Sequence, residues 1–197
     1  WGEIRAWLDR DYPEAVLVSE WAQPHLAIPA GFHMDFMLPF GTPGYISLWR
    51  KEHGDGGNHD PYGASYFDPS GRGNINEFLD NYLFHYNRTK DQGFIAIPTG
   101  NHDSGPRIAT GRSLEQIELI YLFLLSMPGT PFIYYGDEIG MRSVDGLPSK
   151  EGGYQRTAIR TPMQWDGSAN AGFSGAPADK IYLPIDPDHA RPTAAAQ

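Results

Sequence analysis

Residues 94–103 read FIAIPTGNHD, an apolar run that stops abruptly at polar residues. Residues 94–97 are uniformly apolar, which predicts a strand buried on both faces, as in a parallel sheet. The run leads into Gly100, Asn101, His102 and Asp103, so polar side chains follow the carboxyl end of this predicted strand.

The segments on either side repeat the alternation of helix and buried strand. Downstream, Ser113 is a predicted N-cap for a helix over 114–127, and a strand over 131–135 follows. Upstream, Asn74 caps a predicted helix over 75–88, and strands are predicted at 15–18 and 32–38 after an initial helix that ends near Tyr12. Such alternation predicts a parallel sheet with helices outside it, either an open doubly wound sheet or a closed barrel.

Three of the predicted strands run into acidic residues. Glu20 follows the strand at 15–18, Asp103 follows the strand at 94–97, and Asp137 and Glu138 follow the strand at 131–135. In a barrel the carboxyl ends of the strands converge on the face that carries function. The sequence therefore indicates carboxylate chemistry at that face.

Composition and missing motifs exclude several other classes. The chain has 197 residues, 40% of them hydrophobic, and a formal net charge of −9 without a basic stripe, which argues against nucleic acid as a partner. It has no cysteine, and no apolar run reaches the roughly 18 residues of a membrane span. A phosphate-cradling glycine motif and the Gly-x-Ser-x-Gly elbow of α/β-hydrolase esterases are both missing.

Four stretches together resemble glycoside hydrolase family 13, the α-amylase family. They are VLVSEW at 16–21, GNHD at 100–103, GTPFIYYGDEIGM at 129–141, and RTPMQWD at 160–166 followed by NAGF at 170–173. The last pair is similar to members that act on short α-glucosides, such as oligo-1,6-glucosidases and trehalose synthases. The resemblance implies a (β/α)8 TIM-barrel, of which residues 1–197 form the C-terminal half with strands five to eight.

The resemblance also implies catalytic roles. Glu20 corresponds to the family's general acid/base, Asp103 to its transition-state stabiliser, and His102 to a donor to the same sugar. The nucleophilic Asp is expected upstream of Trp1. Burial of Glu20 beside Trp21 and other acids would hold its proton near neutral pH.

Three further residues are candidates for substrate binding. By resemblance, Arg156 and Arg160 approach the innermost glucose or pair with acids of the barrel mouth; surface salt bridges are the plain alternative. Trp165 either lines the acceptor side or packs in the core.

The stretch GFHMD at 31–35 resembles the nucleophile segment of the same family. However, His33 stands where that segment usually has Arg, and the stretch follows Glu20 instead of preceding it. We therefore interpret it as the sixth strand, with Asp35 as a polar residue of the barrel mouth or interior.

We expect no cofactor and no catalytic zinc, because no His-x-x-x-His pair is present. The loop DGGNHD at 55–60 has oxygen ligands suited to calcium, but it lacks the spacing of an EF-hand and is more typical of a solvated loop.

Two functions fit these observations. The first is part of a retaining hydrolase or transglycosylase acting on an oligosaccharide or disaccharide α-glucoside. The second is a non-catalytic barrel relative that binds sugar or another protein. In both cases half a barrel leaves sheet edges open, so we expect one of three states: a piece cut from a larger protein, a chain paired with the missing barrel half, or a self-associated half-barrel. A β-sandwich domain is expected beyond Gln197.

Overall fold

The computed structural model describes residues 1–49, 65–67, 71–103, 106–149 and 156–197. These residues form two compact units. Among the described residues, the first unit comprises 1–49, 65–67, 71–98 and 121–132, and the second comprises 99–103, 106–120, 133–149 and 156–197.

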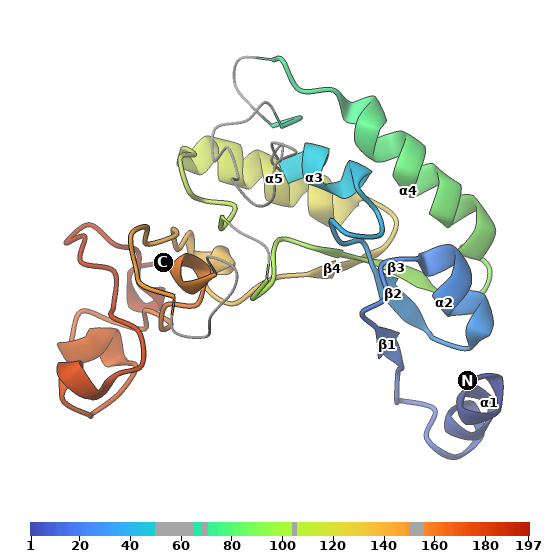
Figure 1. Ribbon diagram of the computed structural model, residues 1–197, viewed down its shortest axis with the longest axis horizontal. Coiled ribbons are helices and arrows are strands. Elements are labelled where there is room, and N and C mark those ends of the chain that lie inside the picture. The colour runs from blue at the N-terminus through green and yellow to red at the C-terminus, as the bar shows by residue number, and fades with distance from the viewer. Residues whose placement is uncertain (50–64, 68–70, 104–105, 150–155) are drawn as a thin grey trace. The chain divides into compact units, whose positions relative to one another are not determined.

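The first unit contains a parallel sheet of four strands in the order β1-β2-β3-β4 (Figure 1). The strands are β1 (Val18–Ser19), β2 (Met34–Phe36), β3 (Phe94–Pro98) and β4 (Thr130–Phe132). The predicted parallel order is confirmed. Strands β1, β2 and β4 are shorter than the predicted 15–18, 32–38 and 131–135, whereas β3 extends one residue beyond the predicted 94–97.

The α-helices of the described residues are α1 (Gly2–Asp11), α2 (Pro24–Ala30), α3 (Gly44–Trp49), α4 (Ile75–Thr89) and α5 (Leu114–Ser126). Both predicted caps are confirmed. The Asn74 side chain accepts a hydrogen bond from the amide of Asn76 at 3.0 Å. Ser113 and Gln116 form a reciprocal capping box, with bonds of 2.9 and 3.4 Å.

Helices α2 and α3 were not predicted. Each is short, with 7 and 6 residues respectively, and α2 has Pro29 inside it. A helix of this length has little intrinsic stability, so tertiary packing decides whether it forms. Both pack against α4 (Figure 1).

The core of the first unit lies around β3, whose residues Ile95, Ala96 and Ile97 are buried. The carbonyl of Pro98, the last residue of β3, accepts hydrogen bonds from the Tyr45 hydroxyl and, at 3.1 Å, from the Trp49 indole. The end of β3, just before the Asn-His-Asp turn, is therefore firmly held.

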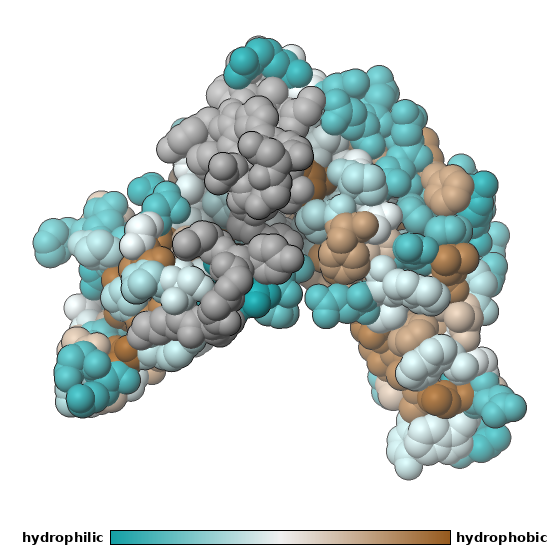
Figure 2. Space-filling view, in the orientation of Figure 1, coloured by the Kyte–Doolittle hydropathy of each residue, from teal (hydrophilic) through white to brown (hydrophobic). Residues whose placement is uncertain are grey.

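Helix α1 shows the predicted helical spacing of apolar residues but has no buried residue. Trp1 is 62% exposed, and Ile4 and Trp7 are also exposed. In Figure 2 the lower right, where Figure 1 places β1 and α1, shows brown hydrophobic surface interspersed with white and teal. An apolar face left uncovered in this way agrees with the expectation that part of the barrel is missing.

Within its described residues, the second unit contains the first half of α5 and several short 3-10 helices. Those that carry or flank candidate residues are η1 (Asp137–Ile139), η2 (Thr157–Ile159) and η3 (Ala169–Gly172). Within the described ranges, no helix combines the length and apolarity needed to cross a lipid bilayer.

Candidate active site

Glu20 follows β1 directly, and its side chain is exposed. The expected burial of this residue is not observed, and Trp21 beside it is 48% exposed. The reason is the position of β1, which pairs only with β2 among the described strands and leaves its other side uncovered. Glu20 is thus accessible to solvent.

Asp35, in β2, is completely buried. One carboxylate oxygen accepts hydrogen bonds from the Ser19 hydroxyl at 2.5 Å and the Trp21 amide at 3.0 Å. The other accepts from the Gln23 amide at 2.7 Å. A nucleophile must reach the anomeric carbon, whereas this carboxylate is occupied by donors of its own chain. The interpretation of Asp35 as an interior strand residue is confirmed.

Asp103 is the centre of a charged cluster in the second unit. One carboxylate oxygen accepts from Nη2 of Arg160 at 2.9 Å and also from Nη1 of Arg156. The other lies 3.5 Å from Nε2 of His102. Nε of Arg160 donates to the backbone carbonyl of His102 at 2.7 Å. Four of the residues proposed from the sequence therefore meet here.

The Asp103 side chain remains 43% exposed although two arginines hold it. Its own amide donates to Oδ1 of Asn101 at 2.8 Å, which fixes the tight turn after β3. An accessible carboxylate in a fixed orientation can accept hydrogen bonds from a ligand. The two arginines pair with an acid, an arrangement that fits both the expected pairing at the barrel mouth and the alternative of a surface salt bridge.

A buried ion pair in the second unit was not predicted from the sequence. Arg107 and Asp137 have completely buried side chains, with Nη1 of Arg107 3.3 Å from Oδ1 of Asp137. The other Asp137 oxygen accepts from the Thr99 hydroxyl at 2.6 Å. Burial raises the pKa of Asp137 to about 6, because desolvation outweighs the hydrogen bond from Thr99 and the charge of Arg107.

Arg107 links this pair to the segment that carries the other arginines. It donates to the carbonyl of Tyr135 at 2.5 Å and to the carbonyl of Ile159 at 2.9 Å. Its guanidinium also lies over the Tyr134 and Tyr135 rings. Because Ile159 directly precedes Arg160, Arg107 braces the backbone beside the Asp103 cluster. No local sequence signal marks Arg107 for this role.

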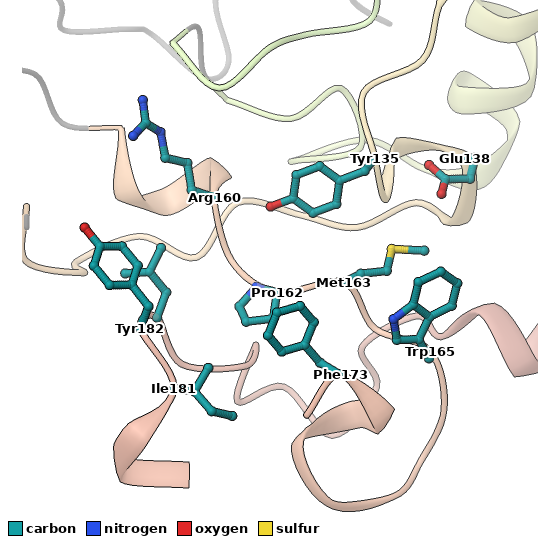
Figure 3. A pocket seen from close by; sticks show the side chains of 10 residues that line it. Tyr135, Glu138, Arg160, Pro162, Met163, Trp165, Phe173, Ile181 and Tyr182 are labelled. Carbon is teal, nitrogen blue, oxygen red and sulfur yellow. The ribbon is translucent and has the colours of Figure 1, made fainter. Parts of the chain in front are cut away.

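Trp165 lines a pocket of 450 Å³ within the second unit. Its side chain is 52% exposed, which rules out the core-packing alternative. Figure 3 shows the aromatic side chains of Tyr135, Phe173 and Tyr182 around the pocket, with the guanidinium of Arg160 directed away from them. Pro162, Met163, Ile181 and Leu183 add apolar surface, and Glu138 is the acidic residue of the lining.

The turn at 169–172 holds Trp165 in place. Asn170 and Ala171 both have φ near +53°, and the Trp165 amide donates to the Ala171 carbonyl at 2.8 Å. The Asn170 side chain donates to the carbonyls of Ser174 and Ala176, each at 2.8 Å. Asn tolerates the left-handed region better than most residues, which explains its use in this turn.

No group of three or more potential metal-binding side chains occurs in the part of the chain that the structure describes. The candidate calcium loop at 55–60 lies outside the described residues.

Comparison with known proteins identifies the family. The alpha-amylase family model, for the catalytic domain, matches residues 73–197. A trehalose synthase/amylase of Mycolicibacterium smegmatis is 48% identical over 74 residues, which are 38% of this chain and 12% of that protein. Maltase A2 of Drosophila melanogaster is 36% identical over 92 residues, 47% of this chain and 16% of the maltase. The amino acid transporter heavy chain SLC3A1 of Mus musculus is 37% identical over 86 residues, 43% of this chain and 12% of that protein.

Solved structures show the same fold. A trehalulose synthase MutB mutant superposes with a TM-score of 0.68 at 20% identity, covering 99% of this chain and 39% of the synthase. The isomaltulose synthase of Erwinia rhapontici gives a TM-score of 0.65 at 18% identity, covering 100% of this chain and 39% of the synthase. The chain thus spans about two-fifths of these structures. It belongs to the alpha-amylase family and forms part of that family's (β/α)8 catalytic barrel.

Proposed function

We propose that this chain supplies the acid/base Glu20 and the transition-state stabiliser Asp103 of a retaining α-glucoside hydrolase or transglycosylase. The observation that carries the proposal is the Asp103 cluster, in which an accessible carboxylate is oriented by Arg156 and Arg160 beside His102. A plain surface ion pair needs one cation, whereas this carboxylate has two and stays open to solvent. Membership of the family supports the same roles.

In this proposal, Glu20 protonates the departing glycosidic oxygen and then removes a proton from water or from an acceptor sugar. A nucleophilic carboxylate about 5–5.5 Å from Glu20 attacks the anomeric carbon, and we expect it in the part of the barrel upstream of Trp1. Asp103 accepts hydrogen bonds from ring hydroxyls, and these strengthen as the ring flattens toward the oxocarbenium ion. His102 donates to the same sugar.

The pocket beside Trp165 supports a short substrate. Aromatic rings offer flat apolar surface to the faces of a sugar, and Arg160 belongs both to the pocket lining and to the Asp103 cluster. Trehalose synthases and a maltase are among the relatives, and their names refer to disaccharides. We therefore propose a disaccharide-sized α-glucoside, with Trp165 on the acceptor side.

The test is hydrolysis of p-nitrophenyl α-glucoside by this chain alone and by this chain mixed with a recombinant upstream half of the barrel. Activity is expected only on mixing, and Glu20→Gln should abolish it. Glu14→Gln, an exposed acid of the same unit, is the matched control and should leave activity unchanged. Activity of the mixture that survives Glu20→Gln would refute the assignment. We propose that no metal is needed, so EDTA should leave the rate unchanged.

One observation favours the second function, a non-catalytic binding or interaction subunit. The transporter heavy chain is 37% identical over 86 residues, so the family resemblance extends to a protein whose name is not that of a hydrolase. Trehalose, maltose and sucrose should then bind to the folded, mixed barrel without turnover. Turnover of any of them would favour the enzyme.

A further inference from the structure

Asp35 is a buried carboxylate that the proposed chemistry does not use, and it contacts the loop on both sides of Glu20. Ser19 precedes Glu20 and Trp21 follows it. Both donate to the same oxygen of Asp35, through the Ser19 hydroxyl at 2.5 Å and the Trp21 amide at 3.0 Å. The backbone of Glu20 is therefore held between two bonds to one atom, while its side chain extends into solvent.

The second oxygen of Asp35 holds the end of the same loop. It accepts from the amide of Gln23 at 2.7 Å, and Gln23 is the residue before α2. The three hydrogen bonds thus join the end of β1, the loop and the start of α2 to β2. Both oxygens of the Asp35 carboxyl thus accept hydrogen bonds from its own chain.

The backbone between these bonds is unusual. Ala22 has φ of +60° and is completely buried. Gly41 packs against it so closely that a Cβ on Gly41 would lie 2.3 Å from the Ala22 carbonyl oxygen. A non-glycine residue in the left-handed region persists only where the surroundings hold it there. Asp35 and Gly41 provide those surroundings.

We propose that Asp35 is a positioning residue that sets the place of Glu20 for proton transfer. This inference rests on the proposed function, in which Glu20 is the general acid. Catalysis by a general acid requires hydrogen-bond distance to the leaving oxygen, and a displacement of about 1 Å can cost about 100-fold in rate. Because the Glu20 side chain is exposed, we infer that its position depends on the backbone that Asp35 holds.

The diagnostic substitution is Asp35→Asn. The Asn side chain has nearly the same shape as Asp, but its NH2 group is a donor and would face a donor of the loop where a carboxylate oxygen accepted a hydrogen bond. The measurement compares kcat/KM for two substrates on the assembled barrel. Maltose has a poor leaving group that needs protonation, whereas 2,4-dinitrophenyl α-glucoside has a leaving group that does not. We expect kcat/KM for maltose to fall by about 100-fold and that for the dinitrophenyl substrate by less than about 5-fold.

Ser19→Ala is the second variant. It removes one bond to the Asp35 carboxylate and leaves both backbone bonds, so it keeps the inference testable if Asp35→Asn does not fold. We expect kcat/KM for maltose to fall by about 3- to 5-fold and kcat/KM for the dinitrophenyl substrate to stay unchanged. Glu14→Gln should change neither value.

Three results would overturn the inference. Equal losses for both substrates would mean that Asp35 only maintains folded protein. Unchanged maltose activity in either folded variant would mean that the loop does not depend on these bonds. Wild-type maltose activity in Glu20→Gln would remove the proposed function and this inference together. By contrast, if Glu20→Gln loses maltose activity and Asp35→Asn keeps it, the proposed function stands and only the positioning role of Asp35 is refuted.

Discussion

The buried pair of Arg107 and Asp137 makes a prediction that depends on pH. The substitution is Arg107→Met, which keeps an unbranched side chain of similar length and removes the charge. Both side chains of the pair are completely buried. Removing one partner of such a pair typically costs about 3–5 kcal/mol, because the other charge is left uncompensated.

The expected loss is smaller in acid. Burial raises the pKa of Asp137 from 3.8 to about 6, so at pH 5 this carboxyl is mostly protonated and at pH 8 it is ionised. At pH 5 the substitution removes mainly the hydrogen bonds to the carbonyls of Tyr135 and Ile159, which costs about 1–3 kcal/mol. At pH 8 the substitution also leaves the ionised Asp137 carboxylate buried without a cation. We therefore expect a loss of about 3–5 kcal/mol in the free energy of unfolding.

In the unsubstituted protein, the pKa of Asp137 also fixes the direction in which stability changes with pH. The folded state holds the Asp137 proton more tightly than the unfolded state does, since the folded pKa is the higher one. The contribution of this group to stability is therefore fully present below pH 3.8 and is lost as the pH rises through 6. At about 1.4 kcal/mol per pKa unit, the loss is on the order of 3 kcal/mol.

The assay is urea unfolding of the assembled barrel at pH 5 and pH 8, with and without Arg107→Met. The control is Arg107→Met in an Asp137→Asn background, where the cost should be the same at both pH values. A loss below about 1 kcal/mol at pH 8, or an equal loss at the two pH values without the background change, would refute the reasoning.

Two further predictions concern the pocket and a helix end. Trp165→Ala should raise KM for a disaccharide about 10-fold with little change in kcat, since about 1.4 kcal/mol of apolar contact is lost; an unchanged KM would exclude the pocket from substrate binding. Asn74→Ala should lower the free energy of unfolding by about 1 kcal/mol through loss of the α4 cap, and the Tm by about 2–4 °C. The neighbouring exposed Asn76→Ala keeps the donating amide and should cost nothing measurable; equal losses in both variants would contradict the capping role.

Features carried by neighbouring residues could be predicted from the sequence. The apolar run at 94–97 predicts a buried parallel strand, and the structure has β3 there, buried from Ile95 onward but with Phe94 exposed. The caps at Asn74 and Ser113 act over two or three residues and were also correct. The short helices α2 and α3 were missed because their stability comes from packing on α4, which no local pattern records.

In the candidate site, too, some features could be predicted from the sequence and others could not. The motif at 100–103 and the arginines of 156–160 marked the residues that meet at Asp103, although their mutual contacts join positions 53 and 57 residues apart. The burial expected for Glu20 was wrong, because it depends on which neighbours β1 has in the sheet.

The sequence by itself determined the order of the four strands and of α1, α4 and α5, the ends of these helices and the family, because these depend on residue types at short and regular spacings. Only the tertiary structure decided that Asp35 holds the Glu20 loop and that Arg107 compensates Asp137. These contacts connect residues 12 to 30 positions apart. A carboxylate or guanidinium takes its role from the donors, acceptors and burial that folding places around it, and a linear pattern does not contain that information.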